Sequence, residues 1–324
     1  MFQFIVYLRA ICAMIITNAH YEDIYPVSII ANGGLLGDVL FFAISGYCIY
    51  NIKDNFIKWY GKRIQRIYPA VWIITVVYLV LGFYHVGSGK ELFELLIYPT
   101  YYHFVASIMV LYIIYYVMIF MLKRFGRNRS RLLKLYMVVV FGIYVLIYLI
   151  NYDKSYYHID SVYEPLIRFL FLESMLLGAW FREKSAVFTA KIRKSDGIGT
   201  VVLFGIYFAS KLMFNRYELL APYQILNQIV LFGLLFYIFR LFAGMERYYE
   251  KLPKVFRIIA HNVSGITLEI YLVQYALISR LNILGFPVNF ILVTMGIWIT
   301  AMILNKLSSS VVNGISNAVR RKEK

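Results

Sequence analysis

Two ionisable side chains lie inside the first apolar stretch, at a spacing that predicts one shared helix face. The run FIVYLRAICAMIITNAHYE at residues 4–22 contains Arg9 and, eleven residues later, His20. In a helix this spacing makes three turns plus about 20°, with a rise of about 16 Å. A charged side chain in the bilayer core costs about 2.5–3.5 kcal/mol, so such residues usually face the interior of a bundle. The alternative is that Arg9 extends to the cytoplasmic interface and His20 lies in the opposite headgroup layer.

A second pair, Arg63 and Arg66, lies in the basic segment KDNFIKWYGKRIQRIYPAVW. Residues three apart are neighbours on one face if the segment is helical, and Pro69 is expected to end one helix or begin the next. Two adjacent guanidinium groups can bind a diphosphate or a phosphate monoester bidentately. Since any basic loop at a membrane surface offers such pairs, the alternative is a basic loop without a ligand.

The composition predicts that membrane helices position these residues. Of the 324 residues, 61% are hydrophobic, whereas a soluble domain has about 45–50%. The net charge of +16 would suggest nucleic-acid binding in a soluble chain, but here the basic residues lie in short loops between apolar runs. We therefore expect membrane lipids as partners and no nucleic acid. Cys12 and Cys48 fall in apolar stretches and are expected to be buried thiols.

The apolar runs predict an all-α integral membrane protein with about ten transmembrane helices. A helix that crosses the hydrocarbon core needs about 17–25 residues, and continuous apolar runs favour helices over a barrel. The predicted spans are residues 4–22, 34–51, 69–86, 104–122, 132–150, 164–181, 197–214, 223–243, 263–281 and 286–307.

The distribution of basic residues predicts the orientation of these spans. Of the 33 Lys and Arg residues, 26 follow even-numbered spans or lie in the tail, and five lie in the opposite loops or span ends. Arg9 and Arg168 lie inside spans. By the positive-inside rule, both termini are expected to be cytoplasmic. We expect a multi-pass protein of the cytoplasmic membrane, with a first span that is retained because it lacks signal-peptide features.

The loops are too short for an extramembrane domain, so residues 1–324 are expected to form one transmembrane domain without an extracytoplasmic accessory domain. Arg168, Glu173 and Glu269 are further polar residues in spans, and each needs a partner or a water-filled cavity. Glu173 and Glu269 either form structural pairs or line a channel for an acceptor. The sequence contains no metal-ligand spacing, phosphate-binding glycine loop or nucleophile elbow, so no metal is expected.

The order of these motifs resembles one known family. The Arg9–His20 pair is followed by GDVLFFAISGYCIY at 37–50, in which small residues usually allow close helix packing, and then by RxxRIYP. In this order the motifs resemble the acyltransferase-3 family of bacterial membrane O-acyltransferases. The segment IRFLFLESMLLGAW at 167–180 looks like a later family span that ends in a small-residue turn, and SGITLEIYLVQ at 264–274 is similar to the penultimate span. The resemblance covers nearly the whole chain.

The resemblance implies ten spans and transfer of an acyl group, usually acetyl, from cytoplasmic acyl-CoA to a hydroxyl of an extracytoplasmic glycan or lipid-linked sugar. It implies that Arg9 and His20 are the family's first-span pair and that Arg63 and Arg66 are its RxxR motif. Our hypothesis is that Arg63 and Arg66 hold the CoA phosphates, that Arg9 lies deeper along the path of the donor, and that His20 is the general base. Family members often carry a histidine where Gln274 stands.

Family members also often have an aspartate closer to the Phe pair than Asp38, so the roles of Asp38 and Gln274 stay open. A transporter of a polysaccharide or lipid-linked sugar is the main alternative, although no clear repeat relates residues 1–162 to 163–324. A glycan polymerase would usually need an extended outer loop. A non-catalytic relative is the remaining alternative. The acceptor and the acyl chain length are not identified by the sequence.

Overall fold

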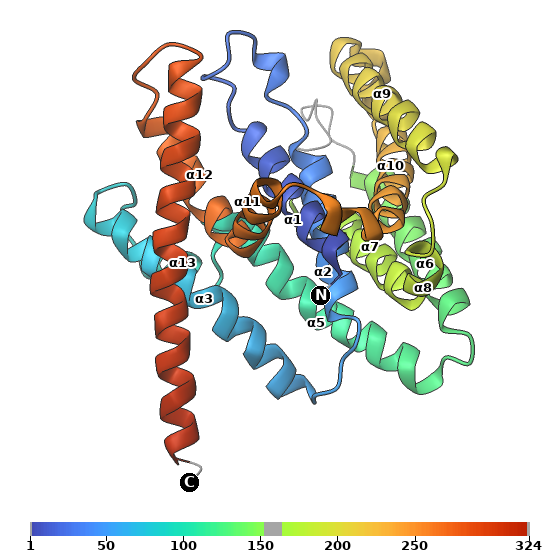
Figure 1. Cartoon of the computed structure of the whole chain (residues 1–324), viewed down its shortest axis with the longest axis horizontal. Helices are drawn as coiled ribbons and strands as arrows, with labels where there is room; N and C mark the ends of the chain where they lie inside the picture. Colours follow the sequence, from blue (N-terminus) through green and yellow to red (C-terminus); the bar gives the residue numbers. More distant parts are fainter. Residues whose placement is uncertain (1, 152–163, 323–324) are drawn as a thin grey trace. The chain divides into compact units, whose positions relative to one another are not determined.

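The protein is all-α in the part of the chain that the structure, a computed structural model, describes: residues 2–151 and 164–322 (Figure 1). No strand occurs in these ranges. The helices are α1 (Gln3–Asn18), α2 (Gly34–Ile49), α3 (Phe56–Val80), α4 (Gly89–Leu96), α5 (His103–Phe125), α6 (Arg129–Asn151), α7 (Glu164–Glu183), α8 (Ser185–Phe188), α9 (Lys194–Arg216), α10 (Ile225–Gly244), α11 (Lys254–Gly265), α12 (Thr267–Arg280) and α13 (Val288–Lys322), with short 3₁₀ segments between some of them. The predicted all-α class is confirmed.

Within the described residues, seven helical segments are long and apolar enough to cross a membrane. The predicted count of ten and the cytoplasmic termini stay predictions. The seven segments are Ser28–Ile49, Phe56–Val80, Gly89–Phe125, Arg129–Asn151, Lys194–Arg216, Ile225–Gly244 and Val288–Gly314.

Helices also occupy the other three predicted spans, residues 4–22, 164–181 and 263–281. Each of these helices is too short or too charged to count among the seven. α1 has only 16 residues because it ends at Asn18. α7 has 20 residues but carries Arg168, Glu173 and Arg182 along its length. α12 has 14 residues because the helical path is interrupted between the end of α11 and the start of α12.

The helix that carries the arginine pair begins earlier than predicted. α3 runs without interruption from Phe56 to Val80 and contains Pro69 in its interior. The prediction that Pro69 ends one helix or begins the next is therefore wrong. A proline removes one backbone hydrogen bond from a helix, but surrounding structure in membrane proteins commonly compensates for this loss. As a result, the segment that contains Arg63 and Arg66 is helical.

The chain divides into two compact units whose segments alternate along the sequence. Unit 1 consists of Met1–Cys12, Leu35–Ile52 and Ile113–Ala260, and unit 2 of Ala13–Gly34, Lys53–Tyr112 and His261–Lys324. The expectation of one transmembrane domain stays a prediction.

In unit 1, α2 and α7 approach each other to backbone contact at two glycines. A methyl group placed on Gly46 would lie 2.1 Å from the carbonyl oxygen of Met175, and one placed on Gly178 would lie 1.9 Å from that of Ala43. Only the absence of a side chain permits such an approach. The prediction that small residues allow close packing of the second span is confirmed at Gly46.

Aromatic side chains complete the packing of unit 1. The rings of Phe42 on α2 and Phe171 on α7 stack with centroids 4.2 Å apart. α9 and α10 lie along each other in the same unit (Figure 1). The predicted small-residue turn at the end of 167–180 is wrong, because α7 continues to Glu183. Cys12 is buried but Cys48 is exposed, so the prediction of two buried thiols is wrong for Cys48.

Unit 2 is built on α3, α12 and α13, which pack against one another. The hydroxyl of Tyr78 on α3 donates to the carbonyl oxygens of Leu272 and Val273 on α12, each at 3.4 Å. The backbone N–H of Phe104, at the start of α5, donates to the hydroxyl of Tyr271 at 3.2 Å. Tyrosine hydroxyls thus fix the short helix α12 within this unit, next to the helix that carries the arginine pair.

Candidate functional site

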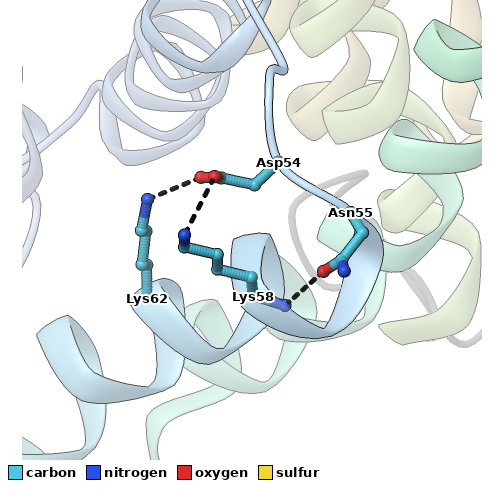
Figure 2. A network of polar contacts seen from close by, with 4 residues as sticks. All are labelled: Asp54, Asn55, Lys58 and Lys62. Carbon is cyan, nitrogen blue, oxygen red and sulfur yellow. Dashed lines mark hydrogen bonds and ion pairs between the residues drawn. The ribbon is translucent and has the colours of Figure 1, made fainter. Parts of the chain in front are cut away.

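The first turns of α3 are fixed by polar contacts around Asp54 (Figure 2). Asn55 caps the helix, because its side-chain oxygen accepts a hydrogen bond from the backbone N–H of Lys58 at 3.0 Å. The carboxylate of Asp54 accepts from Lys62 at 2.5 Å and lies 3.9 Å from the ammonium group of Lys58. The hydrogen bond from Lys62 holds the pKa of Asp54 below its usual value. Both lysines therefore have a carboxylate partner at the start of α3.

Arg63 and Arg66 follow one turn further along α3. The confirmed helix places residues three apart on neighbouring positions of one face. The guanidinium of Arg63 lies over the ring of buried Trp59, 4.8 Å from its centroid. Arg66 is exposed. These two guanidinium groups, one stacked on a ring and one exposed, can together bind an anion through more than one phosphate oxygen.

Unit 2 also contains a buried carboxylate on α12, the helix that packs against α3. Glu269 is only 6% exposed, and its Oε1 accepts a hydrogen bond of 2.9 Å from Nδ2 of Asn305 on α13. Of the two readings that the sequence left open for Glu269, pairing is the one that this geometry supports. Asn305 has no motif that would have identified it, because its role depends on helix packing.

His20 does not lie on the first helix. α1 ends at Asn18, and His20 follows in a turn in which its backbone N–H donates to the carbonyl oxygen of Thr17 at 3.1 Å. The predicted helix 4–22 is wrong at this end, so the predicted shared face and 16 Å rise do not describe His20. The side chain of Asn18 donates to the carbonyl oxygens of Ile30 and Asn32 at 2.9 and 3.1 Å, which ties the end of α1 to the following loop.

The surroundings of His20 belong to unit 2. Its ring lies edge-on to the ring of Tyr275 on α12, with centroids 6.1 Å apart. Although His20 is exposed, partial desolvation by the protein around it lowers its pKa, and the charge of Glu22 opposes this effect. A histidine with a lowered pKa is neutral at neutral pH and can accept a proton.

Gln274 precedes Tyr275 and fixes the end of α1. Its Oε1 accepts a hydrogen bond of 2.7 Å from the hydroxyl of Thr17, and both side chains are buried. Thr17 is three residues before His20. The position where family members often have a histidine thus supports the turn that presents His20. No sequence motif pointed to the roles of Thr17 and Tyr275.

Arg9 lies in unit 1, half-buried on α1. Arg9 and Asp38 of α2 both act electrostatically on the thiol of Cys12, and that thiol donates to the carbonyl oxygen of Gly37 at 2.9 Å. The start of α2 therefore brings an acidic side chain into the neighbourhood of Arg9. Asp38, whose role the sequence left open, is part of this charged group.

Glu173 of α7 is buried in the same unit. Its side chain is 4% exposed, and one carboxylate oxygen has no hydrogen-bond partner among the described residues. The prediction that this residue pairs or lines a channel stays open. Of the four predicted site residues, Arg63 and Arg66 lie together on α3. His20 lies in unit 2 and Arg9 in unit 1, each with the neighbours described above.

Comparison with known proteins agrees with the family that the motif order resembles. The acyltransferase-3 family, described as an acyltransferase domain, matches residues 2–306. No curated protein sequence and no solved structure matches the chain. The family match covers the arginine pair of α3, the turn that carries His20, and nearly all of both units. The chain therefore belongs to the acyltransferase-3 family.

Proposed function

We propose that this multi-pass membrane protein transfers an acyl group, most simply acetyl, from cytoplasmic acyl-CoA to a hydroxyl of an extracytoplasmic glycan or lipid-linked sugar. Membership of a family of acyltransferases supports the reaction class. The acyl-CoA donor, the sugar acceptor and the direction across the membrane are the parts that the proposal adds.

The observation that carries the donor assignment is the arginine pair of α3. Arg63 and Arg66 lie one turn apart, with Arg66 exposed and Arg63 stacked on Trp59. Guanidinium forks suit the phosphate oxygens of CoA better than single ammonium groups do. The nearby Lys62 is held by Asp54, so the arginines are the stronger candidates for binding the diphosphate. Under the proposed orientation this part of α3 is cytoplasmic.

His20 is the proposed general base for the acceptor. Its lowered pKa keeps the imidazole neutral at neutral pH, as a base requires. In the proposed step His20 removes the proton from the acceptor hydroxyl while the oxygen attacks the thioester carbonyl. Collapse of the tetrahedral intermediate breaks the carbon–sulfur bond, and the released CoA thiolate takes the proton from His20. The products are the ester and free CoA, and no further reactant is needed.

Arg9 is proposed to act on the donor deeper in the protein. It is half-buried and lies in the charged group with Asp38. A half-buried guanidinium can hold a carbonyl or phosphate oxygen of the donor through charge-assisted hydrogen bonds.

Membrane vesicles of defined orientation test the donor, the acceptor side and the direction together. Radiolabelled acetyl-CoA is added to inside-out vesicles from cells that express the native chain, His20→Ala or no chain, in a host that makes the native glycan. We expect label in the glycan of the vesicle lumen only with the native chain. Right-side-out vesicles, whose cytoplasmic face is closed to added CoA, serve as the orientation control.

Two results would contradict the proposal. Equal labelling with and without the chain would exclude the transfer. Movement of glycan across the membrane without labelling would favour the transporter alternative.

A further inference from the structure

An exposed aromatic ring lies beside the proposed general base. Tyr275 of α12 is 73% exposed. Its ring stands nearly perpendicular to that of His20, at an interplanar angle of 85° and with centroids 6.1 Å apart. Both side chains belong to unit 2, and His20 is exposed as well. A ligand that binds at the imidazole therefore has an open aromatic surface next to it.

Hydrogen bonds on both sides of His20 hold its turn against α12. Before it, the Thr17 hydroxyl donates to Oε1 of Gln274 at 2.7 Å. After it, the carbonyl oxygen of Asp23 accepts from Nδ2 of Asn282, just beyond the end of α12, at 3.1 Å. These two attachments flank both rings in the sequence. Because groups on well-supported backbone keep their spacing, the two rings present a fixed geometry to a ligand.

The chemistry of the two rings suits a sugar. A pyranose presents C–H groups on its face and hydroxyl groups at its rim. The face of an aromatic ring carries partial negative charge, which attracts such C–H groups. A general base must come within about 2.6–3.2 Å of the oxygen whose proton it removes. A sugar stacked on Tyr275 can turn a rim hydroxyl toward His20, so one bound position satisfies both conditions.

We propose that the ring of Tyr275 is the surface on which a sugar residue of the acceptor stacks, with one hydroxyl of that sugar held within reach of His20. The inference rests on the proposed function, in which His20 is the base. Tyr275 takes no part in the proton transfer. Lipid headgroups would favour a tyrosine anywhere in the interfacial layer, whereas a sugar acceptor needs a ring beside the base.

The measurement is the steady-state kinetics of the purified full-length chain in detergent. Labelled acetyl-CoA is saturating, and the acceptor is glycan extracted from the native strain without the gene. Tyr275→Leu removes the ring and keeps an apolar side chain, so the apparent KM for the glycan should rise about two- to tenfold. Its kcat should change less, and its calorimetric CoA affinity should stay native. Tyr275→Phe keeps the ring and should keep the native KM.

Tyr217→Leu is the matched control. Tyr217 follows α9 in unit 1 and is 54% exposed. Its loop is predicted to lie on the same side of the membrane as His20, so it tests what an interfacial tyrosine contributes away from the base. This variant should keep the native KM for the glycan. An equal rise in KM in both leucine variants would overturn the inference.

Three further results would overturn the inference and leave the transfer reaction standing. A native KM in Tyr275→Leu would assign the ring to the lipid interface. A rise in Tyr275→Phe as large as in Tyr275→Leu would assign the effect to the hydroxyl. A loss of kcat at native KM in Tyr275→Leu would mean that the ring supports His20 and not the sugar.

Two points keep the test decisive. If Tyr275→Leu loses CoA binding, Tyr275→Gln, which also lacks the ring, replaces it with the same expected rise in KM. If the native chain transfers no label to the extracted glycan, the proposed function and the inference are wrong together.

Discussion

Replacing Gly178 with alanine should separate α7 from α2 in unit 1. The new methyl group would lie 1.9 Å from the carbonyl oxygen of Ala43 and 2.9 Å from the backbone nitrogen of Tyr47. Both neighbours are backbone atoms of a helix, so no side-chain rotation can relieve the contact. Reaching an ordinary separation of 3.4 Å from Ala43 needs a local movement of about 1.5 Å.

The size of the effect follows from two opposing terms. Alanine is a better helix former than glycine by about 1 kcal/mol. Overpacking costs about 1–3 kcal/mol and occasionally more, and even a gap of about 0.5–1 Å loses a quarter to a half of each dispersion contact. The stacked pair Phe42 and Phe171 lies in the same helix interface. We therefore expect a net loss of about 2 kcal/mol in the free energy of unfolding.

The assay is thermal unfolding of the purified protein in detergent, followed by tryptophan fluorescence. Gly142→Ala on α6 is the matched control, because a methyl group there meets no atom within 4 Å. The control should unfold at or slightly above the native temperature, and Gly178→Ala several degrees below it. A Gly178→Ala midpoint equal to or above that of the control would refute the assignment of this glycine to backbone contact.

The remaining predictions concern the candidate site. Arg66→Ala and Arg63→Ala should each weaken CoA binding by about tenfold through loss of charge-assisted hydrogen bonds, and unchanged calorimetric affinities would remove them from the donor site. His20→Ala should abolish transfer and keep CoA affinity, whereas retained turnover would exclude His20 as the base. Because its pKa is lowered, the base stays neutral under mild acid, so kcat/KM should fall only below the usual histidine midpoint of about pH 6.5; a midpoint above that value would contradict the role. Gln274→Ala should leave the buried Thr17 hydroxyl without its acceptor, lower the free energy of unfolding by about 1–3 kcal/mol, and reduce kcat more than CoA affinity. Normal stability and turnover would exclude its role in holding the turn.

Hydropathy predicted the helical class because apolar runs leave few alternatives to a helix in lipid. Helix ends were less predictable. The end of α1 depends on hydrogen bonds from Asn18 to carbonyl groups more than ten residues away in the sequence. The interior position of Pro69 is likewise a matter of surrounding structure, since local sequence favours a helix boundary there.

Some residues of the candidate site were likewise predictable from the sequence, and others were not. The Arg63–Arg66 pair was predictable because residues three apart meet on any helix. The partners Glu269 and Asn305 were not, because helix packing brings them together across the sequence. The hydrogen bond between Thr17 and Gln274 joins residues 257 apart in the sequence, with no local signature. Sequence therefore identified the arginines and the histidine proposed to touch the substrates, and the structure added Tyr275 and the residues that hold the site in place.

Mass spectrometry of surface glycans tests the central claim most directly. The samples are the native strain, a strain without the gene, and that strain restored with the native chain or with His20→Ala. The account predicts glycans that carry the mass of an added acyl group in the native strain and after restoration with the native chain, and in neither of the other two. Identical glycan masses in all four strains would contradict it.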